Sequence, residues 1–128
     1  MTKLHDNVNN SIDMHVLREI MGDDEELIKD CFSDLIEDLP EMLKEIREAV
    51  SSGNASSLDE TAHKLKGSLK YLAAKQAADI ANRLEAAGKN QKLENTETDI
   101  KLLEDECEKI ESFVKMYQEK QFKVGTSL

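Results

Sequence analysis

One histidine of the chain lies among lysines at helical spacing. Lys66, Gly67 and Lys70 follow His63 at i+3, i+4 and i+7, so a helix carries all four on the same side. Residues 61–75 contain four lysines and no acidic residue, in a chain whose formal charge is −10. An imidazole nitrogen is a nucleophile, and a lysine ammonium is a compact donor that suits a phosphoryl group. The pattern therefore predicts phosphoryl transfer at this histidine.

Gly67 indicates that the imidazole of His63 is accessible. The apolar residues of the same helix lie within about 80° of one another, and His63 lies about 135° from the centre of that stripe. A glycine inside a helix costs about 1 kcal/mol relative to alanine, and Gly67 removes any side chain one turn beyond the ring. We expect this opening to admit a bulky partner. On these residues alone, an ordinary surface histidine remains the alternative.

The other candidate groups have simpler explanations. His5 lies in a polar segment, and His15 can pair with Glu19 at i+4 on a helix surface. The three histidines share no metal-ligand spacing with one another or with the two cysteines, so no metal site is predicted. Cys31 and Cys107 fall on apolar helix faces, which favours buried free thiols. The sequence has no Gly-rich phosphate loop, so we expect neither nucleotide binding nor an enzyme.

Composition restricts the fold that positions these residues. The 128 residues include five Gly, one Pro and no Trp, which are too few turn formers for a sandwich, a barrel or a Rossmann fold. Good helix formers dominate, which predicts an all-α protein with one modest core. The acidic balance argues against nucleic acid as a partner, and no apolar run reaches the roughly 18 residues of a membrane span. Because the start of the chain has no signal-peptide pattern, we expect the protein in the cytoplasm.

Hydrophobic periodicity divides the chain into one short and four longer helices. Ser11 is the expected N-cap of the short helix, which ends at Gly22. The next helix keeps its apolar stripe in phase through Pro40, which predicts a kink. Gly88 is the expected stop of the fourth helix, and Thr96 the expected cap of the fifth. The expected helices span about 12–21, 25–50, 55–73, 75–87 and 97–120.

These helices predict an up-down-up-down four-helix bundle with a short extra N-terminal helix. The bundle is expected over residues 11–120. Residues 1–10 and 121–128 have no apolar residues in helical register, so we expect them to be flexible tails.

The order of residues 62–68 carries a further signal. They read Ala-His-Lys-Leu-Lys-Gly-Ser, which resembles the A-H-x-L-K-G-S signature of histidine-containing phosphotransfer (HPt) domains. Residues 16–27 and 83–85 are similar to the segments that begin this family's long helix and that face its histidine. The resemblance extends over about residues 12–118. It implies a four-helix bundle whose histidine takes a phosphoryl group from an aspartyl phosphate on one receiver domain and gives it to another.

The resemblance also implies roles for individual residues. His63 corresponds to the phosphorylated nucleophile, Lys66 to the group that stabilises phosphoryl charge, and Gly67 to the clearance for the receiver. Glu85 falls where the family often has a polar residue that hydrogen-bonds the imidazole, so it is a candidate to orient the ring. Ser68 belongs to the motif without a chemical role.

Receiver domains of response regulators and an upstream hybrid histidine kinase are the partners that the family implies. The receiver contributes a carboxylate pocket with Mg²⁺, so the chain is expected to need no cofactor of its own. Lys64, Lys70 and Tyr71 are the expected partner-binding rim, because lysines steer the approach of an acidic pocket. From Lys70 to Ala73 the sequence is bulkier than in many relatives, which bears on partner choice. We expect the chain to act as a monomer.

Two alternatives stand beside a phosphorelay carrier. The first is a helical interaction module in which His63 is never modified. The second is the phosphorylated domain of a chemotaxis-type kinase. The length of the chain favours a free-standing protein over a part of such a kinase, while a domain excised from a hybrid kinase stays open.

Overall fold

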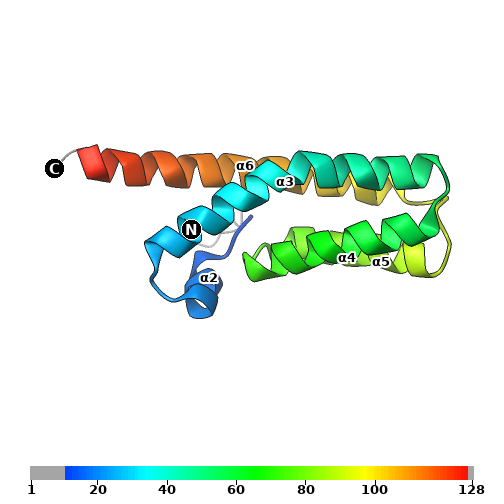
Figure 1. Cartoon of the computed structure of the whole chain (residues 1–128), viewed down its shortest axis with the longest axis horizontal. Helices are drawn as coiled ribbons and strands as arrows, with labels where there is room; N and C mark the ends of the chain where they lie inside the picture. The colour runs from blue at the N-terminus through cyan, green and yellow to red at the C-terminus, as the bar shows by residue number, and fades with distance from the viewer. Residues whose placement is uncertain (1–10, 127–128) are drawn as a thin grey trace, which may run out of the picture.

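The computed structural model contains five helices and, in the residues it describes, no strand. It describes the backbone of residues 11–126 and the side chains of residues 11–119. The helices are α2 (Met14–Met21), α3 (Glu25–Ser51), α4 (Ala55–Tyr71), α5 (Lys75–Lys89) and α6 (Glu97–Thr126). Figure 1 shows α3 and α6 lying along one another above α4 and α5, with the short α2 near the N-terminal end of α3. The predicted all-α bundle with a short N-terminal helix is confirmed.

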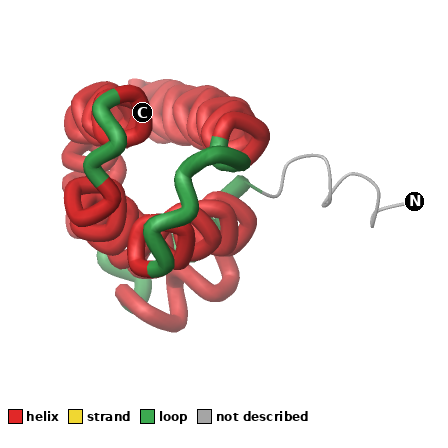
Figure 2. Tube along the Cα trace, turned by 90° about the vertical axis from the view of Figure 1, so that its right-hand side faces the viewer, coloured by secondary structure: helices red, strands yellow, loops and turns green. Residues whose placement is uncertain are grey.

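The four long helices form a closed ring around one core. Each contacts the next in the chain, and α6 completes the ring by packing against α3. Figure 2 shows these helices grouped around a common centre when the bundle is seen end-on. Burial of aliphatic and aromatic side chains stabilises this arrangement. The largest fully buried side chains are Leu17, Ile28, Phe32, Leu39, Ile46, Leu58, Leu65, Leu69, Leu84, Ile100, Leu103 and Ile110.

Helix α3 continues through its proline, as the phase of its apolar stripe predicted. Pro40 lies inside the single helix Glu25–Ser51. Proline removes one backbone donor and crowds the preceding turn, which bends a helix without ending it when both halves are packed. Figure 1 shows the two parts of α3 inclined to one another. Helix α3 packs against both α4 and α6.

The start of α2 differs from the prediction. Asp13, and not Ser11, is the N-cap: its carboxylate accepts a hydrogen bond from the backbone N–H of Val16 at 3.2 Å, and the helix begins at Met14. A carboxylate also interacts favourably with the helix dipole at this end, which explains why it takes the cap. The backbone N–H of Asp13 donates to the carbonyl of Ala73 at 3.0 Å. This bond attaches the start of α2 to the connection that follows α4.

The predicted end of α5 is also wrong, because Gly88 does not stop this helix. The helix continues to Lys89, and the left-handed residue that follows it is Gln91, with φ 55°. A Cβ on Gly88 would lie 2.6 Å from the backbone N of Asp59 and 2.8 Å from the carbonyl O of Ala55. This glycine therefore permits close packing of α5 against α4, and it has no role as a helix end.

The remaining boundaries differ by a few residues. Helix α4 ends at Tyr71, two residues earlier than expected, and Ala73 takes the left-handed conformation with φ 59°. Helix α6 extends to Thr126, so the tail predicted at 121–128 is helical over most of its length, because the loss of an apolar pattern does not mark where an exposed helix ends. The predicted tail at 1–10 lies outside the described residues. Thr96 precedes α6 as expected, but its hydroxyl donates to the carbonyl of Leu93.

Two further sequence predictions concern the thiols and the membrane. Cys107 is buried, Cys31 is half-buried, and both are free thiols. Burial raises the pKa of Cys107 to about 12, so this thiol stays protonated and unreactive at neutral pH. None of the described helices combines the length and the apolar character needed to cross a membrane.

Candidate functional site

Helix α4 presents His63 on its outer face. Its inner face is buried through Leu58, Ala62, Leu65 and Leu69, all of which are fully enclosed. The side chain of His63 is 66% exposed. The helical periodicity thus predicted the direction of the ring correctly.

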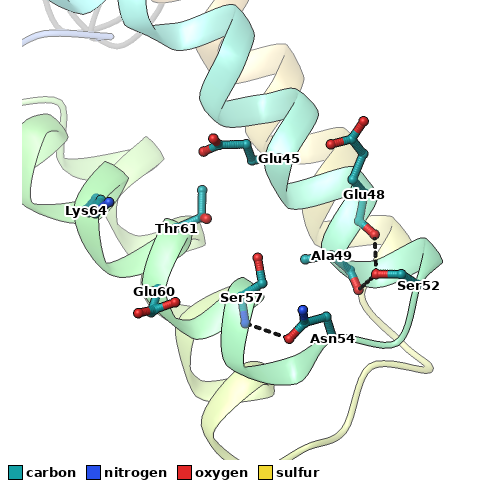
Figure 3. A pocket seen from close by; sticks show the side chains of 9 residues that line it. All are labelled: Glu45, Glu48, Ala49, Ser52, Asn54, Ser57, Glu60, Thr61 and Lys64. Atoms are coloured by element: carbon teal, nitrogen blue, oxygen red, sulfur yellow. Dashed lines mark hydrogen bonds between the residues drawn. The ribbon is translucent and has the colours of Figure 1, made fainter.

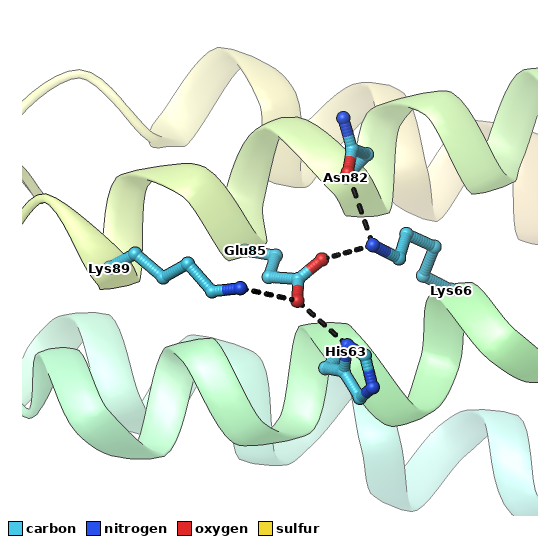
Figure 4. A network of polar contacts seen from close by, with 5 residues as sticks. All are labelled: His63, Lys66, Asn82, Glu85 and Lys89. Carbon is cyan, nitrogen blue, oxygen red and sulfur yellow. Dashed lines mark hydrogen bonds and ion pairs between the residues drawn. The ribbon is translucent and has the colours of Figure 1, made fainter.

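The exposed imidazole is held by a buried carboxylate of the neighbouring helix. Nδ1 of His63 lies 2.7 Å from Oε2 of Glu85, whose side chain is only 4% exposed. Glu85 comes from α5, which packs against α4 along its length. Figure 4 shows the ring turned so that Nδ1 meets the carboxylate while Nε2 lies on the far side of the ring. The candidate orienting residue is therefore in contact with the candidate nucleophile.

Lys66 is bound tightly to the same carboxylate. Its Nζ donates to Oε1 of Glu85 at 2.5 Å and to Oδ1 of Asn82 at 3.2 Å. The side chain of Lys66 is 18% exposed. A short charge-assisted bond to a buried acceptor is among the stronger interactions that lysine makes. Lys66 is thus fixed between two acceptors of α5.

A second lysine approaches the same carboxylate from the other side. Nζ of Lys89 lies 3.2 Å from Oε2 of Glu85, the oxygen that also contacts His63. Figure 4 shows the ammonium groups of Lys66 and Lys89 on opposite sides of Glu85. The sequence pattern singles out neither Lys89 nor Asn82 as a site residue. The available signal was their spacing of i+4 and i−3 from Glu85 on a helix that continues past Gly88.

These contacts determine the charge of Glu85. The hydrogen bond from Lys66, supported by those from His63 and Lys89, lowers its pKa to about 2, against the opposing effect of burial. The carboxylate is therefore ionised at neutral pH.

The ionised carboxylate in turn determines which nitrogen of the ring carries the proton. A carboxylate only accepts hydrogen bonds, so Nδ1 of His63 must carry the proton that it shares with Glu85. In the neutral ring Nε2 then has the free lone pair. The arrangement thus presents a nucleophilic nitrogen to the solvent before any partner binds.

The surface next to the ring is open. A Cβ built on Gly67 meets no atom within 4 Å, so the glycine is not required by packing inside the chain. Lys70 is exposed two turns beyond His63 on the same side of α4. An unobstructed strip of α4 therefore extends from the imidazole toward the end of the helix.

Two of the predicted rim residues lie on a different edge of α4. Lys64 lines a groove between α3 and α4 with Glu45 and Glu48, as Figure 3 shows. Tyr71 is half-exposed and lines a shallow depression with Asp34 of α3. The structure thus brings His63, Lys66 and Glu85 together and places Lys64 and Tyr71 on the side that faces α3.

Possible metal ligands are not clustered in the part of the chain that the structure describes. No group of three or more His, Cys, Asp or Glu side chains there is arranged to hold a metal ion. His15 pairs with Glu19 at 3.8 Å on the exposed surface of α2, as its spacing predicted.

Known proteins share this sequence pattern and this fold. Residues 30–113 match the family model of the Hpt domain. The structure is similar to that of histidine-containing phosphotransfer protein B (HptB) from Pseudomonas aeruginosa PAO1, with 26% identity, a TM-score of 0.74, and coverage of 86% of this chain and 96% of that one.

A second similar structure is the HPT domain from an Hpt sensor hybrid histidine kinase of Shewanella. Its identity is 25% and its TM-score 0.77, and the match covers 88% of this chain and 97% of that one. No curated protein matches the chain. Because the family model matches more than half of the chain and both structures match nearly all of it, the chain belongs to the Hpt domain family, the histidine phosphotransfer proteins of two-component phosphorelays.

Proposed function

We propose that His63 is the residue of this chain that carries the phosphoryl group. It accepts the group from an aspartyl phosphate of one receiver domain and passes it to the aspartate of another. The observation that carries this proposal is the contact between Nδ1 and the ionised Glu85, which leaves Nε2 exposed with its lone pair. No other described histidine has a buried partner, since His15 pairs only with the exposed Glu19.

The transfer step needs no proton from the chain. The Nε2 lone pair of His63 attacks phosphorus, the N–P bond forms, and the P–O bond to the aspartate breaks with its electron pair leaving on the carboxylate. The ring becomes positively charged because Nδ1 keeps its proton. Transfer to the next receiver reverses these bond changes.

Glu85 and Lys66 are suited to this change of charge. The carboxylate of Glu85 accepts the Nδ1–H bond at 2.7 Å, so it stabilises the positive ring that phosphorylation creates. Lys66 keeps Glu85 ionised through the 2.5 Å contact and adds positive charge beside the incoming phosphoryl group. A positively charged ring is also the better leaving group, which favours onward transfer.

The partner completes the site. The receiver supplies the aspartate and the Mg²⁺, so this chain acts as a carrier and not as an enzyme with a complete active site of its own. Gly67 leaves room for the receiver, and Lys70 lies beside its line of approach. Lys64 and Tyr71 contribute to the rim from the α3 side of the helix.

The partners that we propose are response-regulator receivers and an upstream hybrid histidine kinase. The likeness to an HPT domain from a sensor hybrid histidine kinase supports this pairing. The chain acts as a monomer in this proposal, because its four long helices close their ring without a second copy. The proposed setting is the cytoplasm, as the sequence led us to expect.

Transfer from phosphorylated receivers tests the proposal. Mg²⁺-loaded, phosphorylated receivers are mixed with wild-type protein and with His63→Gln, and acid-labile, base-stable label is followed on gels. We expect label on the wild type and none on the variant. Equal labelling of the variant, or no labelling of the wild type by any receiver of the organism, contradicts the proposal and leaves an interaction module.

A further inference from the structure

The two lysines that contact Glu85 differ in how firmly they are held. Lys66 has two acceptors and is mostly buried, with a side chain 18% exposed. Lys89 makes one contact in the described structure, at 3.2 Å, and its side chain is 58% exposed. Lys89 has one contact to lose and Lys66 has two, so Lys89 is the lysine that moves more easily.

The ammonium of Lys89 lies close to the imidazole of His63, whose Nε2 is the proposed nucleophile. Its ammonium and Nδ1 of His63 contact the same oxygen of Glu85, so the ammonium lies within a few ångströms of the imidazole. The four-carbon stem of lysine rotates freely at an exposed site. The Lys89 ammonium can therefore turn from the carboxylate toward a group attached to the ring.

Phosphorylation creates a reason for this movement. The phosphoryl group brings about two negative charges to the exposed side of the ring. Glu85 is buried and needs a cation to remain ionised, and Lys66 already provides it at 2.5 Å. Lys89 is then the cation that the site can release without leaving the buried carboxylate uncompensated.

We propose that Lys89 contacts the phosphoryl oxygens of phosphorylated His63, while Lys66 stays on Glu85 as a positioning residue. This inference rests on the proposed phosphorylation of His63. It assigns a second cation to the carrier. Lys66 holds Glu85 in place and adds positive charge near the phosphoryl group from that position, and Lys89 contacts the phosphoryl oxygens.

The ratio of forward to reverse transfer rates tests this role. Each rate constant is measured as kcat/KM between the chain and one receiver, for wild type and for Lys89→Ala. The ratio of the two kcat/KM values equals the equilibrium constant of the transfer, so the affinity of the two proteins for each other cancels. The ratio therefore reports only how stable the phosphoryl group is on each free protein. Loss of a charge-assisted hydrogen bond is expected to lower the ratio about tenfold.

Two matched variants complete the experiment. Lys75→Ala removes a lysine from an exposed i,i+4 pair at the other end of α5, where Nζ lies 3.1 Å from Asp79. It makes the same charge change on the same helix, so its ratio should equal that of the wild type. Lys89→Arg keeps the charge and the donors, and it should restore the ratio to within about twofold of the wild type.

A spectroscopic measurement separates contact from long-range charge. The proteins are phosphorylated with phosphoramidate in the absence of any receiver, and the ³¹P resonance of the phosphohistidine is recorded. We expect the resonance to move in Lys89→Ala and to stay in place in Lys75→Ala. Unchanged resonance and ratio in Lys89→Ala, or equal changes in both alanine variants, overturn the role of Lys89. Absence of label on the wild type instead contradicts the phosphorylation of His63 itself.

Discussion

Oε2 of Glu85 lies 2.7 Å from Nδ1 of His63, although the first side chain is buried in α5 and the second is exposed on α4. The buried partner is fixed by packing and by the 2.5 Å contact with Lys66. The exposed partner therefore has a defined tautomer and orientation without a ligand. This arrangement reduces the ordering that transfer would otherwise require when the receiver binds.

Replacing Glu85 with glutamine tests how much the carboxylate charge contributes to the rate of transfer. In Glu85→Gln the side chain keeps its size and an oxygen acceptor, but it no longer compensates the positive ring that forms during transfer. We expect the rate of transfer from a receiver to fall about tenfold. Glu104→Gln is the control, because Glu104 pairs with Arg47 between α3 and α6 and lies outside the site. Equal rates in the wild type and Glu85→Gln contradict a role for the charge.

The lowered pKa of Glu85 predicts how stability depends on pH. The group titrates near 4.5 when unfolded and at about 2 in the folded protein, so the folded state favours the charged form. Its contribution to the free energy of unfolding is complete above pH 4.5 and is lost as pH falls toward 2. Denaturant unfolding should show the difference between wild type and Glu85→Gln shrinking over this window. A difference that is constant from pH 6 to pH 2 excludes the linkage.

The two glycines of α4 and α5 predict stability changes of opposite sign. A Cβ on Gly67 meets no atom within 4 Å, so Gly67→Ala should raise the free energy of unfolding by about 1 kcal/mol through helix propensity. A Cβ on Gly88 would lie 2.6 Å from the backbone of Asp59, so Gly88→Ala should lower it by about 1–3 kcal/mol. Urea unfolding of the two variants measures both. Destabilisation by Gly67→Ala would show that the surface above it is packed.

Much of the site could be predicted from sequence because periodicity determines direction. The apolar residues of α4 share one side of the helix, so His63 and Gly67 had to face outward, and both do. Contacts between side chains of different helices cannot be predicted in this way. The contact of His63 with Glu85 depends on the rotation of α5 against α4, which spacing along one helix does not define, and only the family resemblance indicated it.

The omission of Lys89 has a specific physical cause. By its residue type Gly88 predicts a helix end, which would place Lys89 in a loop. The glycine instead permits close approach to Ala55 and Asp59, and the helix continues to Lys89. One glycine supports either a left-handed end or a close contact, and only the neighbouring helix decides between them. The cap of α2 at Asp13 and the extension of α6 to Thr126 are similar errors of boundary.

Charge reversal distinguishes the lysines of the rim. Lys70 is exposed on the same side of α4 as His63, whereas Lys64 lines the groove with Glu45 and Glu48. We expect Lys70→Glu to slow transfer and weaken its salt dependence more than Lys64→Glu, because steering acts on charges that face the approaching pocket. Rates at several salt concentrations provide the measurement. If the double variant matches the wild type in rate and in salt slope, neither lysine belongs to the rim.

The size of the side chain at position 67 should affect the rate at which a receiver phosphorylates His63, and not the rate with a small chemical donor. Gly67→Gln introduces a long side chain one turn from His63, into space that is empty in the free protein. Phosphoramidate is small enough to reach Nε2 past this side chain, so chemical phosphorylation should stay within about twofold of the wild type. A receiver must bring a whole loop surface against α4, where the added side chain obstructs docking. A tenfold loss of rate corresponds to an activation free energy raised by about 1.4 kcal/mol. We therefore expect transfer from the receiver to fall by more than tenfold in Gly67→Gln and by less in Gly67→Ala. If both donors slow equally, Gly67 acts on the ring itself, and its open surface is not the docking clearance that we propose.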